Sequence, residues 1–237
     1  MTMSECIQII NEIENAALLC EKEYSHEDIF NILKIEDKSD IDIEKQICIL
    51  KLEKIKTQEE ADLLVYHLTN HHGLIREAVA SKLNELMSCD KYSRYFQTEY
   101  ISDSLLKAVN DINPNICRLI TEILPFVVNK DYFLKKLYIR FDEIFDELEK
   151  LKRSNWFTKK LFNLYWGLEA LNSLSADCDE RLEDVLEKSS MFKDYTIREK
   201  TAMVLYYLAS SSLKSEEIKK RLKKDSNYYV KRYSQYW

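Results

Sequence analysis

Glycine and proline are both scarce in this chain of 237 residues, which has two of each. Average usage is roughly 7% glycine and 5% proline. Tight hairpins and phosphate-binding loops need residues that accept positive φ, which is mainly a property of glycine. With only Gly73 and Gly167 available, an α/β enzyme or a β-sandwich is hard to build. Helices joined by short polar turns need far less glycine, so the composition favours an all-α fold.

Three further absences bear on location. No run of about 18 apolar residues occurs, so we expect no membrane-spanning helix and no membrane partner. The six cysteines form no CxxC pair, which favours small buried side chains in a reducing compartment. Glu5, Glu12 and Glu14 interrupt the first apolar stretch, so we expect no signal peptide. These absences predict a cytoplasmic protein.

A pattern that recurs about every 40 residues is the strongest signal in the chain. Each copy begins with an apolar residue that is followed by a basic or small one. The copies begin at Ile75, Ile116, Phe157, Ile197 and Val230, which are 41, 41, 40 and 33 residues apart, and a weaker copy begins at Ile43. Apolar or small residues follow at helical spacing, including Ala80, Thr121 and Ala202 at one shared offset. Another helical pattern precedes each copy, so the repeated unit is helix, short turn, helix.

Helix-start signals agree with this unit. Asn113 and Pro114 supply an N-cap and a proline at the first helical position. Pro125 lies within the helix that Pro114 opens, so we expect a kink or an early end there. Gly73 is expected in a turn between two helices. Capping boxes are predicted at three places, namely Thr57 to Glu60, Thr196 to Glu199 and, as an acidic variant, Ser25 to Asp28.

The helices at 74 to 86 (LIREAVASKLNEL) and 195 to 209 (YTIREKTAMVLYYLA) resemble the second helix of a HEAT repeat. The resemblance covers roughly residues 26 to 237, and the family's turn aspartate is matched only loosely, by Asp194 and Asp225. It implies a right-handed αα superhelix of about five to six hairpins. We therefore predict an amphipathic capping helix over 1–24 and a repeat array over 25–237. HEAT arrays serve many unrelated partners, so the resemblance predicts the fold better than the function.

In HEAT arrays the second helices line the concave face. The resemblance therefore implies that bases near the starts of these helices form a ladder on that face, and the ladder residues are Arg76, Arg118, Lys159, Arg198, Lys231 and Arg232. Such a ladder suits an acidic segment of a protein partner. The first hypothesis is therefore a non-enzymatic scaffold. The alternative is that these bases bond turn carboxylates such as Asp194 and Asp225.

The second hypothesis is nucleic-acid binding at the carboxy-terminal end. The chain has a net charge of −6, but residues 213–237 carry eight bases and three acids. Bases interleaved with aromatic residues can pair with phosphates and stack on nucleobases, and the candidates here are Lys220, Arg221, Lys224, Tyr228 and Tyr229. The alternative is a terminal repeat whose charged outer face keeps it soluble.

Enzymatic motifs are weak. The sequence has no GxxxxGK, GxGxxG or GxSxG motif, and we predict no catalytic residue, cofactor or metal. His67 and His71 are four apart and could share a helix face as metal ligands. The better explanation is that His71 and His72 stand beside Gly73 at a helix carboxy terminus, where imidazoles can bond free carbonyls. HEAT-like enzymes are a third possibility. Trp156 and Trp166 are available for a HEAT-like DNA glycosylase, but Asn155 stands beside the first where an acid would be needed. These glycosylases resemble the chain only in architecture, and a HEAT-like bilin lyase belongs to the same third possibility. HEAT-type deoxyhypusine hydroxylase uses repeated His-Glu pairs, and this chain has one, His26-Glu27.

Overall fold

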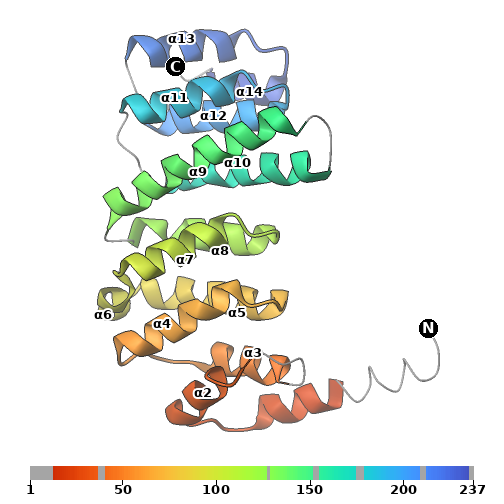
Figure 1. Cartoon of the computed structure of the whole chain (residues 1–237), viewed down its shortest axis with the longest axis vertical. Coiled ribbons are helices and arrows are strands. Elements are labelled where there is room, and N and C mark those ends of the chain that lie inside the picture. The colour runs from red at the N-terminus through yellow and green to blue at the C-terminus, as the bar shows by residue number, and fades with distance from the viewer. Residues whose placement is uncertain are drawn as a thin grey trace, which may run out of the picture. The chain divides into compact units, whose positions relative to one another are not determined.

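The computed structural model describes residues 13–36, 41–126, 129–151, 155–174, 179–208 and 212–234, and every regular element within them is helical. The all-α prediction is therefore confirmed (Figure 1). The chain divides into two compact units, Met1–Phe96 and Gln97–Trp237. The right-handed superhelix and the boundary between a cap and a repeat array stay predictions.

Unit 1 begins with helical residues 13–21 and continues through α2 (His26–Leu33), α3 (Asp42–Lys51) and α4 (Gln58–Tyr66). A short 3₁₀ turn, η1 (His67–Thr69), links α4 to α5 (Gly73–Met87), and the unit ends with α6 (Asp90–Ser93) and η2 (Arg94–Phe96). The main contact is between α3 and α5, and α2 packs on α3. Gly73, which we expected in a turn, is the first residue of α5.

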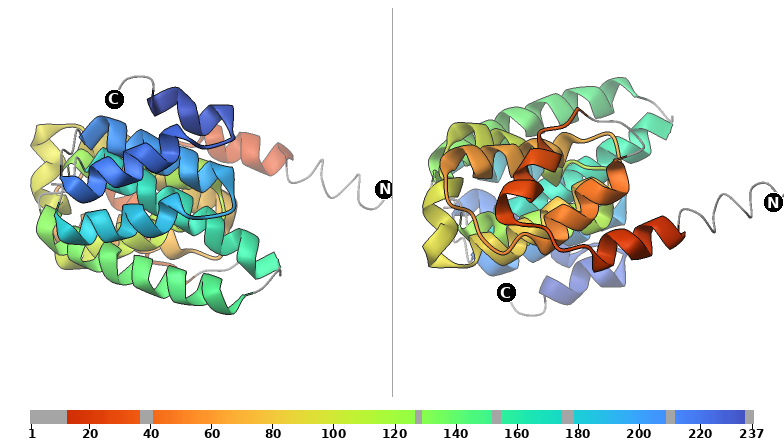
Figure 2. Two further views of the ribbon diagram at one scale, coloured as in Figure 1. Left: turned by 90° about the horizontal axis from the view of Figure 1, so that it is seen from above. Right: turned by 90° about the horizontal axis from the view of Figure 1, so that it is seen from below.

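Unit 2 is a series of four helical pairs, which are α7 (Glu99–Val109) with α8 (Pro114–Ile123), α9 (Lys130–Lys150) with α10 (Asn155–Ser173), α11 (Glu180–Ser190) with α12 (Tyr195–Leu208), and α13 (Leu213–Lys223) with α14 (Tyr228–Ser234). The second helices touch in the order α8, α10, α12, α14, and the first helices in the order α7, α9, α11, α13. Figure 2 (left) looks onto the last pair, where α13 and α14 lie side by side.

The recurring apolar positions form the core. Ile75, Ile116, Ile197 and Val230 are each 0% exposed, which confirms that these equivalent positions are internal. The small residues at the shared offset, Ala80, Thr121 and Ala202, are also buried. A small residue at this position lets neighbouring helices approach closely. The side chain of Phe157 lies outside the described residues. None of the described helices is long and apolar enough to cross a bilayer.

Gly167 is needed where α10 crosses α9. A Cβ atom at this position would lie 3.0 Å from two ring atoms of Phe141, whose side chain is fully buried. The glycine therefore permits a close approach that any larger residue would oppose.

The helix ends confirm some of the predicted signals. Asn113 caps α8 by accepting a hydrogen bond from the Asn115 amide, and Pro114 is the first helical residue. The α-helix ends at Ile123 and passes into a 3₁₀ turn, η3 (Leu124–Phe126), so the early end expected from Pro125 is confirmed. A proline cannot donate the backbone hydrogen bond that continuation of the helix would require.

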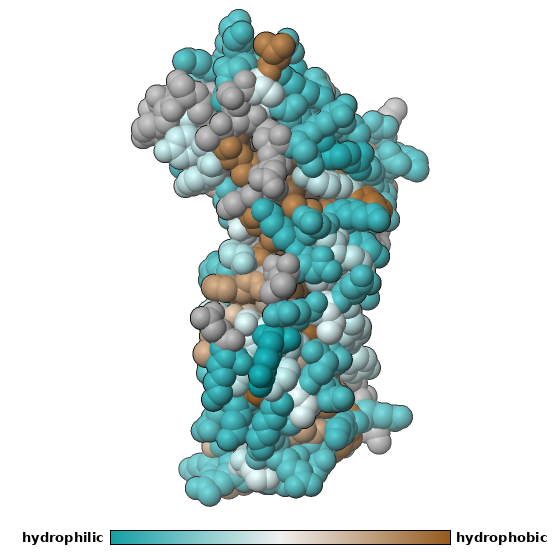
Figure 3. Space-filling view, turned by 90° about the vertical axis from the view of Figure 1, so that its left-hand side faces the viewer, coloured by the Kyte–Doolittle hydropathy of each residue, from teal (hydrophilic) through white to brown (hydrophobic). Residues whose placement is uncertain are grey.

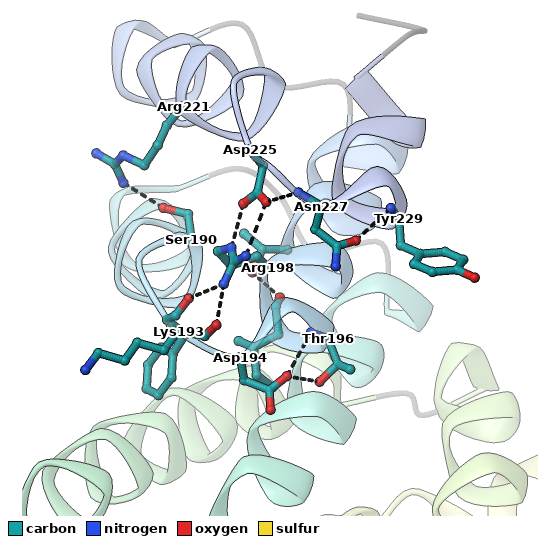
Figure 4. Close-up of polar contacts among 12 residues, drawn as sticks. Ser190, Lys193, Asp194, Thr196, Arg198, Arg221, Asp225, Asn227 and Tyr229 are labelled. Atoms are coloured by element: carbon teal, nitrogen blue, oxygen red, sulfur yellow. Dashed lines mark hydrogen bonds and ion pairs between the residues drawn. The ribbon is translucent and has the colours of Figure 1, made fainter.

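Two of the three capping boxes differ from the prediction. The Ser25–Asp28 box is complete. Thr57 accepts from the Glu60 amide, but the Glu60 carboxylate bonds the Lys56 amide instead of reaching Thr57. The box predicted at Thr196 is wrong. Thr196 is the second residue of α12, and Asp194 accepts hydrogen bonds from both its amide and its hydroxyl (Figure 4). Asp194 stands before the helix, so its carboxylate satisfies the unpaired amide there.

Candidate protein-binding surface

At two repeat positions, the arginine that follows the buried apolar residue closes the turn before its helix. Arg76 Nη1 donates to the carbonyls of Asn70 (2.9 Å) and His71 (3.3 Å), six and five residues earlier. Arg198 Nη1 donates in the same way to Phe192 and Lys193, both at 2.7 Å. In the α7–α8 hairpin Cys117 takes this place, and its Sγ donates to the Asp111 carbonyl at 3.3 Å. The Ile-Arg pattern that defines the repeat thus has a local structural role at residues 76 and 198.

Asparagine and aspartate side chains stabilise these turns by hydrogen bonds to the backbone. Each accepts a hydrogen bond from the amide two residues further on, which is an Asx turn. At the first turn position the pairs are Asn70 with His72, Asp111 with Asn113, and Asp225 with Asn227, at 2.7 to 2.8 Å. Two residues later the pairs are Asn113 with Asn115, Asp194 with Thr196, and Asn227 with Tyr229, at 2.8 to 2.9 Å. Sequence reasoning missed Asn70 and Asp111, although both stand six residues before the turn-closing side chain.

Arg198 also joins two successive hairpins (Figure 4). Its Nε lies 2.6 Å and its Nη2 3.2 Å from the carboxylate of Asp225, which stands in the α13–α14 turn. The side chains are 16% and 9% exposed, so water screens this pair only weakly. The Arg198 guanidinium lowers the pKa of the Asp225 carboxyl below its ordinary value. The alternative in which such bases bond turn carboxylates is therefore observed for Arg198.

The other bases of the ladder have different surroundings. Arg118 is exposed and pairs with Glu122 on its own helix, at 2.6 Å. Lys159 is exposed near the start of α10. The charge of Lys231 helps to lower the pKa of the Asp225 carboxyl. Arg232 Nη2 lies 2.6 Å from a Glu199 carboxylate oxygen, so it joins α14 to α12. A role in partner binding for the whole ladder stays a prediction.

Exposed tyrosines gather where α12 meets α14. The rings of Tyr195 and Tyr229 are stacked with centroids 6.2 Å apart, and those of Tyr206 and Tyr233 are 6.3 Å apart. The Arg232 guanidinium lies 4.9 Å from the Tyr233 centroid and 5.8 Å from that of Tyr229. Tyr195 is 41% and Tyr229 50% exposed, although both rings touch an aromatic neighbour. We call these residues the tyrosine–arginine surface (Tyr195, Tyr206, Tyr229, Arg232 and Tyr233).

A largely buried set of charged and aromatic side chains joins α12 to α10. Lys200 of α12 pairs with Glu169 of α10, and its ammonium lies 4.4 Å from the ring centroid of Tyr165. The next residue, Trp166, has a buried indole N–H that meets no acceptor among the described residues. Cations therefore lie near aromatic rings of α10 and α14, whereas the rings of Tyr195 and Tyr206 on α12 contact other tyrosines.

The five residues predicted to contact nucleic acid lie at two helices, α13 and α14. Arg221 Nη1 donates to Ser190 Oγ of α11 at 2.6 Å, and Lys220 and Lys224 are exposed at α13. Tyr228 and Tyr229 belong to α14. Figure 4 shows Arg221 and Tyr229 on opposite sides of the Arg198–Asp225 pair. Arg221 and Tyr229 therefore do not belong to one mixed basic and aromatic surface, although they are close in the sequence.

The histidines take part in local hydrogen bonds. His67 is buried and its Nε2 lies 3.0 Å from the Leu33 carbonyl, whereas His71 is exposed and lies 3.4 Å from the Asp42 carboxylate. His26 Nε2 is 2.9 Å from Glu60 Oε1. Within the described ranges no group of three His, Cys, Asp or Glu side chains is placed to hold a metal. The side chains of Asn155 and Trp156 lie outside the described residues.

The face drawn in Figure 3 is mainly hydrophilic, and its apolar residues form interrupted patches.

No protein-family model matches the chain, and no curated protein matches it. Among solved structures, it is similar to the crystal structure of an engineered protein, at 14% identity and a TM-score of 0.48, over 88% of this chain and 94% of the other. A second engineered protein is similar at 13% identity and a TM-score of 0.42, over 88% of this chain and 56% of the other.

Proposed function

We propose that the chain is a HEAT-type scaffold without enzymatic activity that binds a protein partner through the tyrosine–arginine surface. The observation that carries this proposal is the stack of Tyr195 on Tyr229, which are exposed and come from successive hairpins. Tyrosine and arginine are the residues that most often dominate the binding energy at protein interfaces. A tyrosine ring offers a large apolar area and a polar hydroxyl at low entropic cost.

The arrangement of the surface favours binding because its side chains are already held. Arg232 is held by Glu199 and lies near two rings, and Tyr206 is held against Tyr233. Ordering a flexible side chain on binding costs about 0.5–1.5 kcal/mol, and a preordered one avoids most of that cost. The surface also spans two repeats, so its shape depends on the stacking of hairpins.

The test is affinity capture from the native cell with the Tyr195→Ala/Tyr229→Ala double variant. We expect the captured protein to be lost, while Tyr66→Ala, which removes an exposed tyrosine of unit 1, captures it as the wild type does. Circular dichroism and urea unfolding of each variant check that the fold is kept. Equal capture by a folded double variant would refute the role of this surface.

Nucleic-acid binding is the second candidate, and it is favoured by the exposure of Lys220 and Lys224 at the carboxy-terminal end of α13. It predicts binding to single-stranded or duplex DNA at low salt that weakens steeply as salt rises, because bound cations are released. Lys220→Glu/Lys224→Glu should abolish that binding. Wild-type protein that does not retard DNA at about 50 mM salt, where phosphate contacts are strong, would exclude this candidate.

A further inference from the structure

Two further tyrosines extend the tyrosine–arginine surface along α12 and α14. Tyr207 is 60% exposed and lies edge-on to Tyr206, with ring centroids 5.1 Å apart. Tyr228 is 67% exposed and lies edge-on to Tyr229, with ring centroids 5.8 Å apart. The guanidinium of Arg232 connects the two groups of rings. We call the tyrosine–arginine surface together with Tyr207 and Tyr228 the tyrosine row.

The arginine charges at the tyrosine row are already balanced within the chain. Arg232 pairs with Glu199, and Arg198 of the same two hairpins pairs with Asp225, each at 2.6 Å. A carboxylate or phosphate of a partner would have to compete with these carboxylates, so the row favours neither an acidic peptide nor a nucleic-acid backbone. A partner cation is also disfavoured, because Arg232 already lies within reach of two ring faces. The charges therefore favour an uncharged segment.

The phenol hydroxyls add hydrogen-bond donors beside the rings. Four side chains of the row are 41 to 67% exposed, so carbonyls of a partner can reach them, and these are Tyr195, Tyr207, Tyr228 and Tyr229. A segment that suits both the rings and the hydroxyls has apolar side chains and free backbone carbonyls. A polyproline II helix has no internal hydrogen bonds, so its carbonyls stay available. Proline also has no backbone N–H that binding would leave without an acceptor.

The spacing of the rings fits the same conformation. On α12, Tyr195 and Tyr206 are eleven residues apart, which is about three turns and roughly 16 Å, so both lie on one face of the helix. On α14, their ring partners Tyr229 and Tyr233 are four residues apart, or roughly 6 Å. Ring pairs that join the two helices therefore have an intermediate spacing. Prolines three residues apart lie about 9 Å apart on one side of a polyproline II helix, which is within that range.

We propose that the tyrosine row binds a proline-rich segment of a partner protein in the polyproline II conformation. This inference rests on the proposed function and names the chemistry of the partner. Two proline rings, three residues apart in the segment, pack on the Tyr195–Tyr229 and Tyr206–Tyr233 pairs. The hydroxyls of Tyr195 and Tyr229 donate to carbonyls of the segment. Such a segment is stiff before it binds, so it loses little conformational entropy.

Fluorescence anisotropy tests the proposal with four labelled probes of equal length, which are oligoproline, a Gly-Ser repeat, oligoglutamate and oligothymidylate. We expect wild-type protein to bind oligoproline at least about tenfold more tightly than each other probe. Tyr195→Ala/Tyr229→Ala should weaken oligoproline binding by at least about tenfold, because it removes one ring pair. Tyr66→Ala/Tyr100→Ala is the matched control, since it removes two exposed tyrosines outside the row. Surface contacts away from the row contribute little, so the control should alter affinity less than about twofold.

Tyr195→Phe/Tyr229→Phe separates the hydroxyls from the rings. It keeps both rings but removes two donors, so oligoproline should bind about three- to tenfold more weakly. Circular dichroism shows which variants are folded, and the phenylalanine variant decides the matter if the alanine variant does not fold. Another probe that binds as tightly as oligoproline, an equal loss in the control, or unchanged binding in either folded variant of Tyr195 and Tyr229 would overturn the proposal.

The proposed function and this inference can fail separately. Loss of the captured protein in folded Tyr195→Ala/Tyr229→Ala, together with wild-type protein that does not bind oligoproline, would support the surface and refute the proline-rich segment. Unchanged capture, together with oligoproline binding that this variant loses, would support the segment and refute the role of the surface in that capture.

Discussion

Replacing Arg198 by alanine tests the link between the last two hairpins. The change removes the two contacts of Arg198 with the Asp225 carboxylate and the two hydrogen bonds to the carbonyls of Phe192 and Lys193. It leaves a carboxylate that is 9% exposed without its cation. In a repeat protein, such a contact between neighbouring repeats contributes directly to the stability of the array.

The expected loss follows from the burial of this pair. Breaking a fully buried ion pair by removing one partner costs about 3–5 kcal/mol. Because the Arg198 side chain is 16% exposed, water can partly solvate what remains, and we expect a loss of about 2–3 kcal/mol in the free energy of unfolding. Asp225→Ala also removes the acceptor of the Asn227 amide, but it leaves no buried carboxylate without its cation. It should cost less than Arg198→Ala, because Arg198 keeps its two carbonyl acceptors and can reach solvent. The pairwise coupling should be about 1–2 kcal/mol.

The assay is a double-mutant cycle measured by urea unfolding of the wild type, Arg198→Ala, Asp225→Ala and the double variant. Repeating it across pH adds a second readout. Arg198 lowers the pKa of Asp225, so the carboxylate stabilises the fold fully above its ordinary pKa of 3.8, and this contribution disappears as pH falls further through the lowered pKa. The coupling should therefore persist at pH 5 to 7 and shrink below about pH 3.8. A coupling within about 0.3 kcal/mol of zero at pH 7 would refute the reasoning.

Three other predictions concern buried positions. Gly167→Ala should lower stability by about 1 kcal/mol in urea unfolding, because the clash with Phe141 outweighs the better helix propensity of alanine; a more stable variant would contradict this. Burial raises the pKa of the Cys48 and Cys117 thiols to about 12, so iodoacetamide at pH 8 should modify neither until urea unfolds the protein, as mass spectrometry would show. Asn163→Leu should raise the free energy of unfolding by about 1 kcal/mol, since it removes a buried acceptor without a donor, and a lower melting temperature would count against that assignment.

The sequence predicted the helices and the internal face of the repeats. Spacing alone identified Ile75, Ile116 and Ile197 as equivalent buried residues, because helical periodicity and the repeat length both act locally along the chain. The end of α8 at Ile123 also followed from one local cause, the proline two residues later. These features need no knowledge of which helices touch.

The roles of the bases could not be derived in the same way. Arg76 and Arg198 occupy equivalent positions, and the sequence allowed either a groove or a turn contact for each. The outcome depends on the path of the chain before the helix, which brings carbonyls six and five residues earlier within reach of the guanidinium. Asn70 and Asp111 stand at the first position of their turns, six residues before Arg76 and Cys117. This recurring Asn or Asp was the sequence signal that could have predicted the turn contacts.

The candidate surfaces depend on contacts between distant residues. Tyr195 stands two residues before Ile197 and Tyr229 one residue before Val230, so alignment of the repeats would pair Tyr195 with Tyr228 instead. Nothing in the spacing shows that Tyr195 and Tyr229 would be exposed and stacked.

The turn contacts made by Arg76, Arg198 and Cys117 have a kinetic consequence. Each spans only five or six residues, so little chain entropy is lost when it forms. Proteins whose contacts are mostly local fold fast. Each of these hairpins can therefore close its own turn before it meets its neighbours, and folding can begin at more than one place along the chain.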